Sequence, residues 1–182
     1  MEEYLYELKI PKQRIAVLVG KKGEIKKRIE QETETKIKID SKEGDIFITG
    51  TDNLKLYSAQ TIIKAIGRGF NPEKALLLLK TDYLFEMINI MDYSKTQSDL
   101  IRLRGRVIGK QGKGRNTIES LTNCYISVFG KTISVIGLAE NIALSVKAIE
   151  KLLKGAPHSK VYAWLERKRV EFKRAEQLEE QE

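Results

Sequence analysis

Apolar and polar residues recur with two different periods along the chain, and these periods separate predicted strands from predicted helices. Alternation at every second position over residues 4–10, 36–40 and 45–49 predicts half-buried strands. Apolar residues spaced three and four apart over residues 14–19, 24–33 and 52–66 predict helices with one buried face. The order of elements in this first part is therefore β-α-α-β-β-α.

The same order of elements returns in the second part of the chain. Residues 83–91, 125–129 and 132–136 predict strands, while residues 100–108, 114–121 and 139–153 predict helices. The polar stretch 92–99 has no counterpart in the first part, so we expect an inserted loop there with the start of a helix inside it. The fold class is therefore expected to be α+β, built from two repeats of one unit.

Segments outside the repeats set the expected domain boundaries. A short helix with four consecutive leucines, Leu76 to Leu79, follows the first repeat, and we expect it to be buried between the two halves. A last helix begins near residue 159 and carries a basic group. We place the first domain at 1–70, a connecting helix at 71–81, the second domain at 82–155, and a C-terminal helix with a frayed tail at 156–182.

A Gly-x-x-Gly turn lies between the first two helices of each repeat. The turns consist of Gly20, Lys21, Lys22 and Gly23 and, 89 residues later, of Gly109, Lys110, Gln111 and Gly112. Glycine allows a sharp turn and a close approach of the backbone to a ligand. The helix that follows offers unpaired N–H groups and a partial positive charge, which suit phosphate. The duplicated turn therefore predicts a clamp for a nucleic-acid backbone.

Charge and composition restrict the class of function. The net charge of +8 favours an anionic partner, and basic residues surround both turns. No apolar run approaches the ~20 residues of a membrane span, and the N-terminus lacks the features of a signal peptide. We therefore expect a cytoplasmic protein with no membrane contact. One cysteine excludes an intramolecular disulfide and a cysteine-rich zinc site.

Candidate catalytic groups do not stand out in the sequence. The carboxylates are scattered over charged helices, and neither an acid–base pair nor an acidic metal-binding cluster can be recognised. We therefore expect a protein without a cofactor that is not an enzyme. An RNA nuclease that uses the repeats for targeting is disfavoured on the same grounds.

The turns and their flanks resemble a known family. Residues 17–23 and 107–112, each inside a β-α-α-β-β-α unit, resemble type I KH domains. Residues 105–119 and 133–137 resemble the two-KH small-subunit ribosome-assembly factors of archaea and eukaryotes. The resemblance implies that the chain binds single-stranded RNA at the 3′ end of small-subunit rRNA or its precursor. It also implies two kinds of protein partner: the endonuclease that matures this end, and other assembly factors.

The resemblance implies RNA contacts at both turns and along a groove between the first two helices and the adjacent strand. The candidate residues are Val17, Gly20, Lys21, Lys22, Gly23, Ile37 and Lys38 in the first repeat, and Arg106, Val107, Ile108, Gly109, Lys110, Gln111, Gly112, Lys113, Arg115, Ile126 and Ser127 in the second. KH domains usually have an apolar residue three positions after the second glycine, where this chain has Lys26 and Arg115.

Two other functions stay open at this point. The first is general binding of single-stranded nucleic acid or messenger RNA, which differs from the ribosomal role in sequence preference alone. The second is a protein-interaction scaffold in which the turns no longer bind RNA. Charge reversal at both turns would separate this scaffold from an RNA binder.

Overall fold

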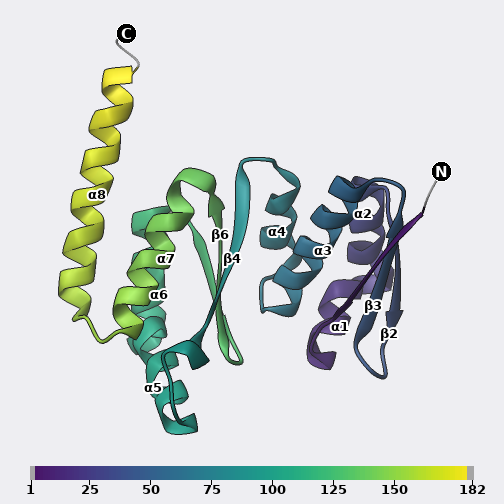
Figure 1. The fold of residues 1–182 in the computed structure, drawn as a ribbon, viewed down its shortest axis with the longest axis horizontal. Helices are drawn as coiled ribbons and strands as arrows, with labels where there is room; N and C mark the ends of the chain where they lie inside the picture. The colour runs from purple at the N-terminus through teal and green to yellow at the C-terminus, as the bar shows by residue number, and fades with distance from the viewer. Residues whose placement is uncertain (1–2, 180–182) are drawn as a thin grey trace. The chain divides into compact units, whose positions relative to one another are not determined.

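The computed structural model describes residues 3–179, and the chain divides into two compact units (Figure 1). The first unit ends at Phe85 and the second begins at Glu86. Each unit contains a three-stranded sheet with helices packed on one face. The expected α+β class, with one β-α-α-β-β-α order in each unit, is confirmed.

The first unit has β3 at the centre of its sheet, in the order β1-β3-β2 with both pairs antiparallel. Ile37 pairs with Ile48 across the sheet, so the apolar side chains of neighbouring strands share the face that the helices cover. The elements are β1 (Tyr4–Lys9), α1 (Lys12–Val19), η1 (Lys21–Gly23), α2 (Glu24–Thr33), β2 (Lys36–Asp40), β3 (Asp45–Gly50), α3 (Asn53–Gly67), α4 (Pro72–Ala75) and η2 (Leu76–Leu79).

The second unit repeats this sheet with β6 at the centre, in the order β4-β6-β5. Its core contains the fully buried side chains of Leu103, Ile118, Ile133 and Leu152, which come from α5, α6, β6 and α7. The elements are β4 (Tyr83–Asn89), η3 (Ile90–Asp92), α5 (Gln97–Ile108), η4 (Lys110–Gly112), α6 (Lys113–Thr122), β5 (Tyr125–Phe129), β6 (Thr132–Leu138), α7 (Ala139–Leu153) and α8 (His158–Glu179).

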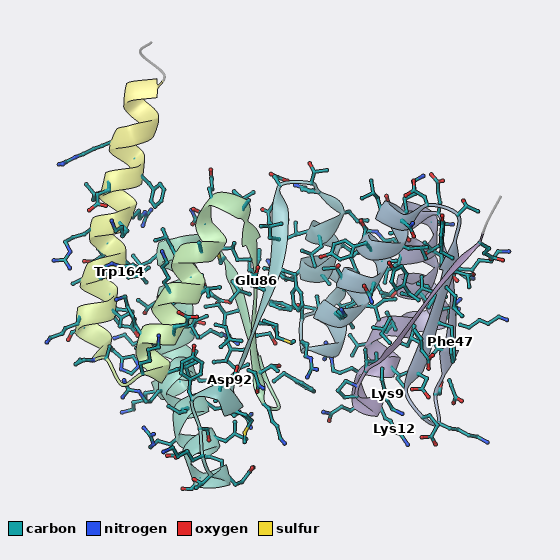
Figure 2. The ribbon with its side chains drawn as sticks, in the orientation of Figure 1. Lys9, Lys12, Phe47, Glu86, Asp92 and Trp164 are labelled. Carbon is teal, nitrogen blue, oxygen red and sulfur yellow. The ribbon has the colours of Figure 1, made fainter. Side chains whose placement is uncertain are left out.

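Helix α8 adds to the second unit an element that the repeat does not include. The buried side chains of Val161 and Leu165 pack its first half against the second unit's core (Figure 1). Trp164, also on α8, lies under the ammonium of Lys151, which is 5.0 Å from the ring centroid (Figure 2). This geometry is a cation–π contact. Helix α8 is therefore fixed to α6 and α7 over its first turns.

Two segments differ in detail from the sequence expectation. The predicted loop 92–99 contains the last residue of η3 and, as expected, the start of a helix, α5, where the Thr96 hydroxyl accepts a hydrogen bond from the backbone N–H of Asp99 at 3.1 Å. This N-cap lets the helix begin three residues earlier than the apolar periodicity indicated. Within the first unit, η2 packs against α3.

In the part of the chain that the structure describes, no helix is both long and apolar enough to span a membrane.

Candidate nucleic-acid interface

The two Gly-x-x-Gly turns have nearly the same backbone conformation. Gly20 has φ 72° and ψ −179°, and Gly109 has φ 72° and ψ 173°. The third residue of each turn, Lys22 or Gln111, has φ 53°, and the second glycine follows with φ 80° or 77°. The turns have kept one geometry although their sequences differ. We therefore treat residues 89 positions apart as equivalent.

Glycine is required at the first position of each turn for two reasons. Its φ lies in the left-handed region that other residues rarely adopt. A Cβ on Gly109 would also lie 2.5 Å from the backbone nitrogen of Gly114, and one on Gly20 would lie 2.4 Å from Cγ1 of Ile25. The first glycine therefore brings the start of the second helix close to the end of the first. The turn between them is narrow, as a backbone clamp requires.

Both turns present positive charge to solvent. Lys21 and Lys22 in the first turn are exposed, as are Lys110 and Lys113 at the second. None of these four lysines forms an ion pair within residues 3–179. Neither α2 nor α6 receives an N-terminal hydrogen bond from a described side chain. Exposed ammonium groups beside free helix N–H groups form a surface suited to phosphate.

A carboxylate connects the second helix of each unit to the edge strand of its sheet. Glu30 accepts a hydrogen bond from the backbone N–H of Ile37 at 2.8 Å, and Glu119 accepts one from that of Ile126 at 2.7 Å. Lys26 pairs with Glu30 at 2.9 Å, and Arg115 lies 3.8 Å from Glu119. Lys26 and Arg115, which replace the apolar residue usual in KH domains, are thus each paired with the carboxylate that joins the helix to the edge strand.

A groove runs beside the first turn. It has a volume of about 460 Å³ and lies between α1, the turn and the β2–β3 loop. Lys12, at the start of α1 (Figure 2), is one of the residues beside it. The lining residues are Lys12, Ile15, Ala16, Val19, Gly20 and Ser41. Of these, the sequence predicted Gly20 and missed the other five, although counting back from Gly20 at helical spacing would have found the four on α1.

Comparison with known proteins identifies the family. Residues 84–170 match the eukaryotic-type KH domain (KH-domain type I), and residues 5–65 match the KH domain. A KH domain-containing protein of Methanocaldococcus jannaschii is 49% identical over 172 residues, which cover 92% of this chain and 75% of that protein. The RNA-binding protein pno1 of Dictyostelium discoideum is 31% identical over 170 residues, which cover 90% of this chain and 71% of that protein. The chain belongs to the PNO1/Dim2 family of two-KH-domain proteins.

A solved structure of this PNO1/Dim2 family has the same fold. The chain superimposes on one from the crystal structure of an a/eIF2alpha–aDim2p–rRNA complex of Pyrococcus horikoshii OT3, with a TM-score of 0.87 and 46% identity. The match covers 93% of this chain and 96% of that one. The two β-α-α-β-β-α units are therefore the two KH domains of a PNO1/Dim2 protein.

Three predicted groove residues of this PNO1/Dim2 chain are buried, which corrects the sequence interpretation. Ile37 is 3% exposed, Val107 is fully buried and Ile126 is 4% exposed. Each side chain points into the core of its unit. They support the groove but do not line it, so RNA cannot touch them.

Arg106 was expected to contact RNA, but its side chain bonds to the protein backbone. Its Nε donates to the carbonyl oxygen of Leu152 at 3.0 Å, and its Nη2 donates to that of Ala156 at 2.7 Å. The guanidinium therefore closes the C-terminal end of α7. Val17 occupies the equivalent helical position in the first unit and is half-buried. Arg106 is thus bonded to the protein backbone, and Val17 is not among the residues that line the groove beside the first turn.

Lys38 and Ser127 lie on the face of the strand opposite to Ile37 and Ile126, because successive side chains of a strand alternate. Lys38 faces Phe47 across the sheet, and both residues line a hollow on the face that the helices leave open. Ser127 pairs with Ser134 of β6. Of the predicted residues, Gly20 lines the groove beside the first turn, and Lys110, Gln111 and Lys113 lie together beside the second turn. Lys38 and Ser127 lie away from both places.

Other candidate chemistry in the PNO1/Dim2 chain is structural. Burial raises the pKa of the Cys124 thiol, which lies 3.5 Å from the carbonyl oxygen of Thr122. His158 places Nε2 2.8 Å from the carbonyl oxygen of Arg106 and so fixes the start of α8. Within the described residues, no three histidine, cysteine or acidic side chains gather in a way that could hold a metal.

Proposed function

We propose that this protein binds single-stranded RNA through its two Gly-x-x-Gly turns during ribosome assembly, at the 3′ end of small-subunit rRNA. The observation that carries the proposal is the duplicated turn, in which one backbone geometry and unpaired lysines occur twice. A KH turn of this kind holds the backbone of about four nucleotides while unstacked bases are read in the groove. Relatives described as RNA-binding, and the rRNA complex of aDim2p, support the same function.

A binding titration tests this function. The ligands are a short 3′-terminal small-subunit rRNA and a scrambled RNA of equal length, and an equally basic protein of another fold serves as control. We expect the protein to prefer the rRNA end over the scrambled sequence. Equal binding to both RNAs would favour the general single-stranded binder, and binding no tighter than that of the control protein would exclude a specific RNA site.

We also propose that the protein acts without catalysing a reaction on its RNA. The family is one of RNA-binding KH proteins, and the residues that line the groove beside the first turn include no carboxylate and no histidine. Incubation of labelled rRNA with the protein and Mg²⁺ or Mn²⁺ should leave the RNA intact. Cleavage that co-purifies with the protein and disappears on charge reversal at a turn would overturn this part of the proposal.

The endonuclease that matures the rRNA 3′ end is the protein partner that we propose. This assignment is supported by the resemblance to the assembly factors. A pull-down with the purified endonuclease, with and without the rRNA end, tests it. We expect the two proteins to co-purify in both conditions. Co-purification only when the RNA is present would show that the RNA bridges them and that they do not bind each other directly.

A further inference from the structure

A second groove lies beside the second turn, between α6 and α8, and the function proposed above does not use it. It has a volume of about 650 Å³. Lys110, Lys113, Asn116, Ser120 and Leu121 line it on one side, and Glu166 of α8 lines it on the other. This wall exists because α8 packs on α6, whereas in the first KH domain only the four-residue η2 contacts the equivalent helix α2 after α3.

The groove lies on another face of α6 from the Glu119–Arg115 pair. Asn116 and Ser120 are one helical turn apart, as are Arg115 and Glu119, but the two pairs are offset by about 100° around the helix. Glu119 bonds to β5, so its face of α6 looks toward the sheet. The face with Asn116 and Ser120 is exposed and looks toward α8. Lys110 belongs to the turn and to this groove and therefore connects the two.

The lining of the groove has the chemistry of a ribose-phosphate site. The ammonium groups of Lys110 and Lys113, the amide of Asn116 and the hydroxyl of Ser120 all supply hydrogen-bond donors. Neither lysine has an ion-pair partner among the described residues. Glu166 alone contributes a carboxylate to this lining, and it would repel a bare phosphate. A ribose beside a phosphate fits both the donors and the carboxylate, because the phosphate can accept from the donors and the 2′-OH can donate to Glu166.

The composition of the groove favours RNA over a protein partner. Protein interfaces are centred on apolar and aromatic side chains, and this groove has Leu121 and no aromatic residue in its lining. Nucleic-acid interfaces are polar and positively charged. We propose that the α6–α8 groove binds the ribose-phosphate of nucleotides that flank those held by the second turn. This inference rests on the proposed RNA binding.

A single negative charge introduced on the face of α6 that lines the groove tests whether the groove binds RNA. Ser120→Glu introduces an acid at an exposed position outside the turn, and Gln31→Glu introduces the same charge at the equivalent exposed position of α2, which has no α8 beside it. The two variants are compared with two RNAs, a tetranucleotide that fills the turn and a longer strand that extends past it on both sides.

We expect Ser120→Glu to weaken binding of the longer RNA about three- to tenfold, the effect of one unfavourable charge near a partly exposed phosphate. It should leave the tetranucleotide within about twofold of the unmodified protein, and Gln31→Glu should change neither RNA comparably. If Ser120→Glu and Gln31→Glu affect the longer RNA equally, the groove does not bind RNA. If the unmodified protein binds neither RNA, the proposed function fails as well.

Glu166→Ala tests the sugar contact separately. Its readout is the ratio of affinities for the longer RNA and for DNA of the same sequence. We expect this ratio to fall, because the loss of the carboxylate removes the acceptor for the 2′-OH and relieves repulsion of the DNA phosphates. An unchanged or larger ratio would overturn the assignment of Glu166, and a thermal melt equal to that of the unmodified protein shows that α8 still packs.

Discussion

Glu30 and Glu119 hold corresponding places in the two KH domains and have the same two partners. Each accepts a hydrogen bond from the second residue of an edge strand, and each has a basic residue one helical turn before it. The sequence predicted the basic residues as departures from the KH pattern. The spacing of four residues could have indicated their pairing with the acid, but the bond from the acid to a backbone N–H of the edge strand depends on the fold.

Glu119 therefore combines a structural and an electrostatic role that two substitutions can separate. Glu119→Ala leaves the N–H of Ile126 without its acceptor, so we expect a loss of about 1–2 kcal/mol in the free energy of unfolding. Glu119→Gln keeps an acceptor oxygen and should recover most of that loss, while Arg115 loses its ionic partner. Denaturant unfolding of both variants measures this difference. Equal destabilisation by Ala and Gln would show that the charge, and not the hydrogen bond, stabilises the domain.

Gly105 is a helical glycine for which the protein itself gives no steric reason. It is exposed in α5, and a Cβ there would meet nothing within 4 Å. Its equivalent in the first domain, Ala16, lines the groove beside the turn. Gly105→Ala should therefore stabilise the protein by about 1 kcal/mol, the difference in helix propensity.

RNA binding by Gly105→Ala should weaken although the protein becomes more stable, because the added methyl group would stand at the position equivalent to Ala16, which lines the groove beside the first turn. Denaturant unfolding measures the change in stability, and RNA titration of the same sample measures the change in affinity. Reduced stability would contradict the open space at Gly105, and unchanged affinity would exclude contact between RNA and this face of α5.

At the scale of elements, the first helix of each domain is held to the third by one arginine. Arg14 donates to the carbonyl oxygens of Ile66 and Phe70 at 2.8 and 2.6 Å, as Arg106 does to those of Leu152 and Ala156. Burial lowers the pKa of Arg14. The two arginines are one helical turn apart in the repeat alignment, so the sequence repeat alone could not reveal their shared role.

We expect Arg106→Ala to destabilise the second domain by about 2–3 kcal/mol, since two charge-assisted hydrogen bonds to helix-terminal carbonyls are lost. Arg106→Lys should not restore stability, because one ammonium cannot reproduce the two-pronged geometry. Thermal unfolding of the whole protein provides the measurement. Arg102→Ala is the control, since Arg102 is exposed and pairs with Asp99 at the surface. Similar losses for Arg102→Ala and Arg106→Ala would contradict the account.

Across the whole molecule, the sequence predicted the repeat, the order of elements and the two turns, because these depend on local periodicity and on glycines at fixed spacing. It was wrong for side chains whose direction depends on packing. Ile37, Val107 and Ile126 were expected in the groove, but the same apolar character that suggested it places them in the core. The groove residues Lys12 and Ser41 come from separate elements that only the folded domain brings together. Helix α8 was predicted, but its position beside the second turn was not.

RNA binding at the second turn is the central claim, and charge reversal at this turn tests that claim directly. The measurement is the affinity of the unmodified protein and of a Lys110→Asp, Gln111→Asp variant for the 3′-terminal rRNA over a range of salt concentrations. Aspartate tolerates the positive φ at position 111 better than most residues, so the variant should fold. We expect it to lose the preference for the rRNA end and to have a salt slope shallower by about 0.7 for each phosphate contact removed. An affinity and a salt slope equal to those of the unmodified protein would show that this turn is not the RNA site.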